Sequence, residues 1–337
     1  MNWNEFYQSL KDGDLRPVYL FSGPEAFIKA EALEALRAKL LPPGLEGLNE
    51  TVLEGAAAAQ IIEAAETLPM MCERRLVTVR DWAPLMSGKS KNEDAEVQRM
   101  ADWLSAPPDS CCLIFYMRGE PDGKKKLTGL LKKLAEPVRF ELLTDPEIAK
   151  WASQRLKPLK KRISPAAAAQ LSFTAGRELT RLAGELEKLA AYTGDRTEIT
   201  VEDIRAVVAP SLEFSVFEML DKLLSGDIPE AQRILNATVE SGQSRLSILA
   251  MFTRQFRSMT HMKLAMEAGG SAQSIEKLFK LNSYAARKMA QQSRRFTREQ
   301  LLRLYRELIE TDYAIKSGQL REQAALDLAF LRIGLKK

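Results

Sequence analysis

The chain has 337 residues, a net charge of +4, 45% hydrophobic and 28% charged residues, a profile typical of soluble globular proteins with two or three domains. No apolar run reaches the roughly 18–20 residues that a membrane span needs, and the polar first fifteen residues do not resemble a signal peptide. We therefore expect a cytoplasmic protein without membrane contact. A single histidine and three cysteines, Cys72, Cys111 and Cys112, argue against zinc sites and most histidine-dependent catalysis.

Residues 17–144 alternate between strand-like and helix-like segments, which predicts βαβ units and a parallel sheet. Near-continuous apolar runs such as "CCLIFYM" suit strands that are covered on both faces. The predicted strands are 17–23, 48–55, 74–82, 110–119 and 138–144, and the predicted helices are 25–41, 56–68 and 93–105.

After Pro146 the pattern becomes entirely helical, because apolar residues recur at helical spacing between capping residues. The sequence thus predicts an α/β domain over 1–144, a small helical domain over 145–210 and a larger helical domain over 211–337. The predicted helices are 163–176, 177–194, 200–208, 215–225, 229–241, 244–267, 271–279, 283–293, 297–317 and 321–335.

The segment "SGPEAFIKAEAL", residues 22–33, stands where a phosphate-binding loop of the form G-x-x-x-x-G-K-[ST] would follow the first strand. Gly23 and Lys29 keep the outer spacing, but Ile28 replaces the second glycine and Ala30 replaces the magnesium-binding hydroxyl. Lys29 is interpreted either as a charge for a phosphate or as a solvated helix residue. We expect a degenerate P-loop that does not bind nucleotide productively.

A working phosphate loop would also need an acidic residue at the end of a neighbouring strand, and this position is altered as well. In "LVTVRDW" Arg80 lies where a metal-binding carboxylate is expected, and Asp81 follows it on the other face of the strand. No constellation of carboxylates suited to two metal ions is evident. We expect neither a metal nor a cofactor.

Five segments resemble one family. They are "AETLPMMCERRLVTVRDW" (65–82), "GRELTRLAGELEKLAAYTG" with "ITVEDIRAVV" (176–208), "FSVFEMLDKLLSGDIPEAQRILN" (214–236), "SILAMFTRQFRSM" (247–259) and "ETDYAIKSGQL" (310–320). In this order they resemble the delta subunit of the bacterial DNA polymerase III clamp loader, an AAA+ family. The resemblance implies an AAA+-like parallel-sheet domain, a small helical lid domain and a C-terminal helical collar domain.

The resemblance also implies a function in DNA replication. Such a subunit opens the sliding clamp without hydrolysing ATP, alongside gamma/tau and delta prime type subunits, and meets primer–template DNA through the assembled complex. No intrinsic enzyme activity is expected, and a DNA-directed DNA polymerase (nucleotidyltransferase) label would follow only from membership of the holoenzyme.

By position, "TLPMM" resembles the clamp-contacting element of that family, with Leu68, Pro69, Met70 and Met71 as its residues. Flexible methionine side chains suit an irregular apolar groove. The alternative is that these residues pack under the sheet at a helix–strand junction. Methionine also stands where relatives commonly have an aromatic residue.

Possible DNA contacts are Tyr313 and the basic clusters "LKPLKKRIS" (156–164, with Lys160, Lys161 and Arg162) and "GKKKLTGLLKK" (123–133). Such residues also occur on ordinary solvated helix faces. The apolar segment "AALDLAFLRIGL" (324–335) predicts a helix face that packs with other subunits. From residue 212 onward there are 20 Lys/Arg against 14 Asp/Glu, so a sequence-independent DNA-binding scaffold is an alternative function, and an active nucleotide-dependent motor is a weaker one.

Overall fold

The structure is a computed structural model that describes residues 1–88, 93–270 and 283–334. It divides into two compact units, Met1–Leu143 and Thr144–Lys337. The helix predicted over 271–279 lies outside the described residues. The further division of the second unit into a lid domain over 145–210 and a collar domain over 211–337 stays a prediction.

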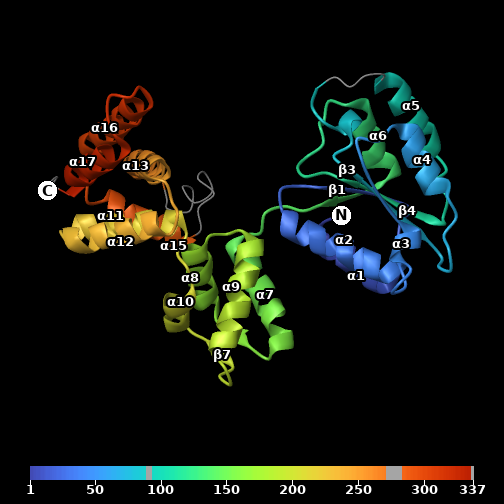
Figure 1. Cartoon of the computed structure of the whole chain (residues 1–337), viewed down its shortest axis with the longest axis horizontal. Coiled ribbons are helices and arrows are strands. Elements are labelled where there is room, and N and C mark those ends of the chain that lie inside the picture. Colours follow the sequence, from blue (N-terminus) through green and yellow to red (C-terminus); the bar gives the residue numbers. More distant parts are fainter. Residues whose placement is uncertain (89–92, 271–282, 335–337) are drawn as a thin grey trace. The chain divides into compact units, whose positions relative to one another are not determined.

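A five-stranded parallel sheet forms the centre of the first unit (Figure 1), with the strand order β2-β3-β4-β1-β5. Its strands are β1 (Val18–Ser22), β2 (Glu50–Glu54), β3 (Arg75–Arg80), β4 (Cys111–Tyr116) and β5 (Glu136–Arg139). The prediction of β5 over 138–144 was wrong in its bounds. Beyond Arg139 the Phe140 carbonyl accepts the N–H of Glu25, so the chain leaves the sheet to pack on the loop after β1.

Helices cover both faces of this sheet, as the apolar runs predict. Helices α1 and α2 contact each other and lie on one face, and α4, α5 and α6 pack on the other (Figure 1). The helices of this unit are α1 (Trp3–Asp12), α2 (Ala26–Leu40), α3 (Glu46–Asn49), α4 (Ala58–Glu66), α5 (Glu93–Leu104) and α6 (Lys126–Leu134), with a 3-10 turn at Ala83–Leu85.

Alternate residues of β1 serve the two layers, because successive strand side chains point to opposite faces. Val18 and Leu20 belong to the core under α4, α5 and α6, whereas Tyr19 and Phe21 meet Phe6 of α1 edge-on at 5.5 and 5.1 Å between ring centroids. The β1 strand is therefore buried throughout. Whatever follows it at its carboxyl end is held on a rigid base.

The second unit is predominantly helical. Its helices are α7 (Asp145–Leu156), α8 (Pro165–Ala175), α9 (Leu179–Tyr192), α10 (Val201–Val207), α11 (Leu212–Ser225), α12 (Ile228–Glu240), α13 (Arg245–Glu267), α15 (Ser283–Ser293), α16 (Arg298–Lys316) and α17 (Glu322–Gly334), with a 3-10 turn at Lys157–Leu159. An entirely helical pattern after Pro146 was wrong in one place. Two short strands, β6 (Arg162–Ile163) and β7 (Glu198–Ile199), pair in parallel.

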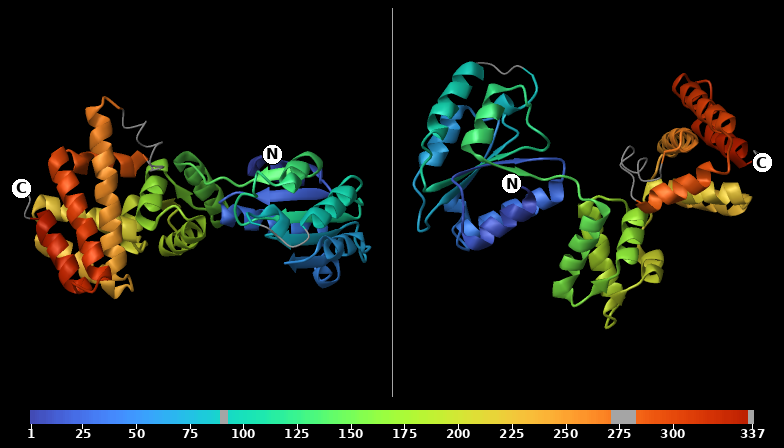
Figure 2. Two further views of the ribbon diagram at one scale, coloured as in Figure 1. Left: turned by 90° about the horizontal axis from the view of Figure 1, so that it is seen from above. Right: turned by 180° about the vertical axis from the view of Figure 1, so that it is seen from behind.

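Helix α13 is the centre of the C-terminal helices: Figure 2 shows it (orange) beside α16 and α17 (red), and it also contacts α11 and α15. Buried side chains from all of these helices form one core, including Phe252, Phe256 and Phe330. Most of the apolar face that was predicted at 324–335 for packing with other subunits is buried in this core. Ala325, Leu326, Ala329, Phe330 and Ile333 are buried, while Leu328 and Leu331 remain exposed.

Candidate functional site

The loop after β1 makes its hydrogen bonds within the chain. The N–H of Gly23 donates to the Gly119 carbonyl at 3.1 Å, the N–H of Glu25 to the Phe140 carbonyl at 2.9 Å, and the N–H of Phe27 to Glu25 Oε1 at 3.1 Å. In a working phosphate loop, such N–H groups face the phosphates. Here the buried Glu25 carboxylate caps α2 in place of an external anion.

Gly23 is required by close packing. Its φ is +114°, and a Cβ at this position would lie 2.3 Å from the Phe140 carbonyl oxygen. The absence of a side chain at Gly23 therefore lets the backbone after β5 pack directly against the loop. The space beside the loop is occupied by this backbone. The glycine at the first position of the motif therefore has a structural explanation that needs no ligand.

Lys29 is buried, and the expectation of a solvated helix residue was wrong. Its Nζ donates to the carbonyls of Gly23, Met117 and Arg118 at 2.7, 2.5 and 3.2 Å. An ammonium has three N–H donors, and here all three are directed at the chain's own carbonyls. Burial lowers the pKa of Lys29, and the nearby carboxylates of Asp81, Glu120 and Glu25 oppose that shift.

The end of β3, where a metal-binding carboxylate was expected, is also bonded within the chain. Asp81, directly after β3, has φ +43° and accepts the Arg118 N–H at 2.8 Å and Arg118 Nε at 2.7 Å. Arg80 extends toward Glu54 at 3.7 Å. The carboxylate nearest to a metal-binding position is thus engaged by an arginine. Ile28 is buried and Ala30 is exposed, and neither supplies a polar group.

The segment between α4 and β3 has the opposite character. Leu68, Met70 and Met71 are 74, 55 and 84% exposed, and Pro69 is partly exposed. The alternative expectation, that these side chains pack under the sheet, was wrong for all three. Three large apolar side chains on one short loop form a patch of a kind that marks interaction surfaces.

A buried asparagine holds this loop in place. The Asn49 side chain, fully buried, accepts the N–H of Met70 at 2.7 Å and donates to the carbonyls of Met70 at 2.9 Å and Leu45 at 3.1 Å. Arg75, also buried, donates to the Thr67 carbonyl at 3.3 Å and to Thr51 Oγ1 at 2.9 Å. The loop backbone is therefore fixed while its side chains face solvent.

Two features of this loop were not predicted from the sequence. Met71 has φ +58°, a left-handed conformation that costs a non-glycine residue about 1–2 kcal/mol. Leu48, which precedes Asn49 on α3, is a further apolar side chain that is 52% exposed. Asn49 precedes Met70 by 21 residues, so no local pattern in the sequence could have indicated that it holds this loop.

The remaining predicted site residues are dispersed. Tyr313 lies on α16 and is 67% exposed. Lys160 has φ +56° and is exposed, whereas Lys161 donates to the carbonyls of Gly194 and Arg196, so its ammonium is occupied in joining β6 to the turn before β7. Arg162 is exposed at the start of β6. In the second cluster Lys125 donates to the Gly88 carbonyl.

Two negative findings apply to the described residues. None of the helices there combines the length and the apolar character that crossing a membrane requires. Within the same residues, His, Cys, Asp and Glu side chains form no group of three that could hold a metal ion. The free cysteines Cys111 and Cys112 are buried, and burial raises the pKa of the Cys111 thiol to about 12.

The sequence of this chain is similar to those of known proteins. Residues 19–141 match the family model described as DNA polymerase III, delta subunit, and residues 213–333 match its C-terminal domain. The chain is 29% identical to the DNA polymerase III subunit delta of Bacillus subtilis, over 98% of this chain and 96% of that protein.

A solved structure extends the similarity to the fold. The Bacillus subtilis DNA clamp loader delta protein matches with a TM-score of 0.67 and 27% identity, covering 99% of this chain and all of that one. The predicted fold class, an AAA+-like parallel-sheet domain followed by helical regions, is confirmed. On these matches, the chain belongs to the family of DNA polymerase III clamp loader delta subunits.

Proposed function

We propose that this chain binds the DNA sliding clamp through Leu68, Pro69, Met70 and Met71 and opens it without hydrolysing nucleotide. The observation that carries this proposal is the loop between α4 and β3, whose apolar side chains are exposed on a fixed backbone. A loop that is already ordered loses little conformational entropy when it binds. Its side chains are therefore well suited to act as the anchors of an interface.

Ring opening requires that the chain bind the open clamp more tightly than the closed clamp, because a ligand shifts an equilibrium only by its differential affinity. The proposed partners within the assembly are gamma/tau and delta prime type subunits, which would supply nucleotide hydrolysis. Primer–template DNA would meet the chain through the assembled complex. The internally bonded loop after β1 supports a subunit without nucleotide chemistry of its own.

The proposal is tested with the purified full chain and the purified sliding clamp. Leu68→Ala with Met71→Ala is expected to weaken binding by about 100-fold or more, since burial of such side chains contributes about 1.5–3 kcal/mol each. Both side chains are exposed in the free chain, so the melting temperature should stay within a few degrees of wild type.

The matched control is Met86→Ala with Leu134→Ala, two apolar side chains of the same unit that are 44 and 43% exposed. This control should bind the clamp like the wild-type chain. Wild-type affinity in the Leu68/Met71 variant, or an equal loss in the control, would refute the assignment of the loop.

A further inference from the structure

The basic charge of the second unit is concentrated in one stretch of sequence. Residues 245–306 contain 13 Lys/Arg against 3 Asp/Glu, whereas residues 211–244 contain 2 against 6 and residues 307–337 contain 5 against 5. An excess of this size produces a positive potential around the helices that carry it, and such a potential attracts polyanions.

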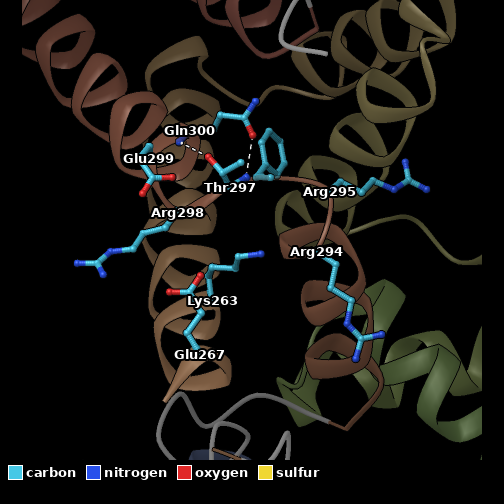
Figure 3. A pocket seen from close by; sticks show the side chains of 9 residues that line it. Lys263, Glu267, Arg294, Arg295, Thr297, Arg298, Glu299 and Gln300 are labelled. Atoms are coloured by element: carbon cyan, nitrogen blue, oxygen red, sulfur yellow. Dashed lines mark hydrogen bonds between the residues drawn. The ribbon is translucent and has the colours of Figure 1, made fainter. Parts of the chain in front are cut away.

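A pocket of about 520 Å³ lies within this stretch (Figure 3). Four cationic side chains line it from three segments: Lys263 from α13, Arg294 and Arg295 from the chain between α15 and α16, and Arg298 from the first residue of α16. The pocket is open, and the three arginines are exposed. Several separate anionic groups could therefore reach these cations at the same time.

The chain offsets these four charges only in part: besides the backbone N–H of Glu299, Arg298 and Lys263 contribute to lowering the pKa of that neighbouring carboxyl. None of the four cations forms an ion pair with another residue in the part of the chain that the structure describes, unlike Arg233 with Glu230 at 2.7 Å or Lys316 with Asp312 at 2.7 Å. The pocket also contains two carboxylates, Glu267 and Glu299, so the cations outnumber them.

The backbone at the start of α16 is already satisfied. Thr297 and Gln300 form a capping box, in which the N–H of Gln300 donates to Thr297 Oγ1 at 3.2 Å and the N–H of Thr297 to Gln300 Oε1 at 2.7 Å (Figure 3). Its own backbone N–H and the Thr297 hydroxyl lower the pKa of Glu299. Attraction for an anion must therefore come from the four cationic side chains and not from free amides at the helix end.

The lining favours nucleic acid over an acidic protein partner. The one apolar residue of the pocket, Phe296, is buried against Phe256, with ring centroids 5.8 Å apart. Protein interfaces usually bury an apolar core, whereas nucleic-acid interfaces are polar and positively charged. Three of the four cations are arginines, whose planar guanidinium groups match phosphate oxygens in pairs.

We propose that Lys263, Arg294, Arg295 and Arg298 form a binding site for the phosphodiester backbone of nucleic acid, independent of base sequence. This site goes beyond the proposed clamp contact and lies on different residues. Its test contains no clamp, so either proposal can fail while the other stands.

The experiment measures fluorescence anisotropy of labelled single-stranded and duplex DNA with the full chain across a salt series. Arg294→Gln, Arg295→Gln and Arg298→Gln together are expected to weaken binding at least about tenfold at low salt. The slope of log affinity against log salt should become shallower by about 2–3, since each lost phosphate contact removes about 0.7–0.9. The two DNA forms distinguish which of them supplies the phosphates, and a loss with either form supports the site.

The control is Arg205→Gln with Arg321→Gln and Arg332→Gln, which removes the same charge from exposed positions of the same unit. It should retain the wild-type salt slope, and circular dichroism should report equal helicity in both triple variants. An equal loss in both would attribute binding to net charge and overturn the site. Absence of DNA binding by the wild-type chain, or binding of a polyglutamate peptide in its place, would overturn it as well.

Discussion

Two opposite edges of the same parallel sheet, at the carboxyl ends and at the amino ends of its strands, differ in which of their side chains are bonded to the chain and which are exposed. At the carboxyl ends of β1, β3 and β4, Lys29, Glu25 and Asp81 are bonded to the chain itself. At the amino ends of β2 and β3, Asn49 and Arg75 fix a loop whose apolar side chains remain exposed. One edge is closed by internal hydrogen bonds, and the other presents apolar side chains to solvent.

This contrast shows how a fold is retained while its site changes. Open α/β sheets usually bind ligands at the carboxyl ends of their strands. Here the polar groups at that edge have become structural links between β1, β4 and the chain after β5. A loop at the opposite edge then remains the better candidate for function, because its apolar side chains gain most from a partner.

The largest expected effect concerns the closed edge. Lys29→Met would leave carbonyls of Gly23, Met117 and Arg118 without their donor, so we expect the free energy of unfolding to fall by about 2–4 kcal/mol. Urea unfolding followed by tryptophan fluorescence measures this change, since three of the four tryptophans lie in the first unit. Lys39→Met, on an exposed position of the same helix, is the control and should change it by less than about 0.5 kcal/mol.

An intermediate effect concerns the anchor of the open edge. Asn49→Ala removes the hydrogen bonds that fix Met70, so the loop should bind the clamp about tenfold more weakly because more backbone freedom is lost on binding. Surface plasmon resonance with the wild-type and variant chains checks this. Asn236→Ala, an exposed asparagine of the second unit, should have wild-type affinity. Unchanged clamp binding by the Asn49 variant would show that a fixed loop is not needed.

The smallest expected effect is the response to nucleotide. A working site at 100 times its dissociation constant would stabilise the chain by about 2.7 kcal/mol. Because Lys29 and the loop amides are already bonded, we expect Mg-ATP to leave the melting temperature unchanged. A rise of several degrees that disappears in the Lys29→Met variant would show that the closed edge still binds nucleotide.

Local patterns in the sequence predicted much of this arrangement. Apolar runs and helical spacing located the sheet strands and most of the helices, and the altered P-loop and the "LPMM" segment were visible as residues. The short pair β6 and β7 was missed because two residues give too little pattern to distinguish a strand from a turn.

The hydrogen-bond partners and the burial of individual side chains could not be predicted in the same way. Lys29 reaches a carbonyl 88 residues away, and Asn49 holds a loop 21 residues away. Contacts of this kind depend on the three-dimensional path of the chain. The same holds for α17, whose apolar residues were expected to face other subunits and are mostly buried in the core around α13.

Amide hydrogen exchange of the full chain with and without the sliding clamp tests the central claim most directly. The account predicts that the clamp slows exchange in residues 67–72 and leaves residues 22–33 unchanged. Slower exchange in residues 22–33 with none in residues 67–72 would contradict it.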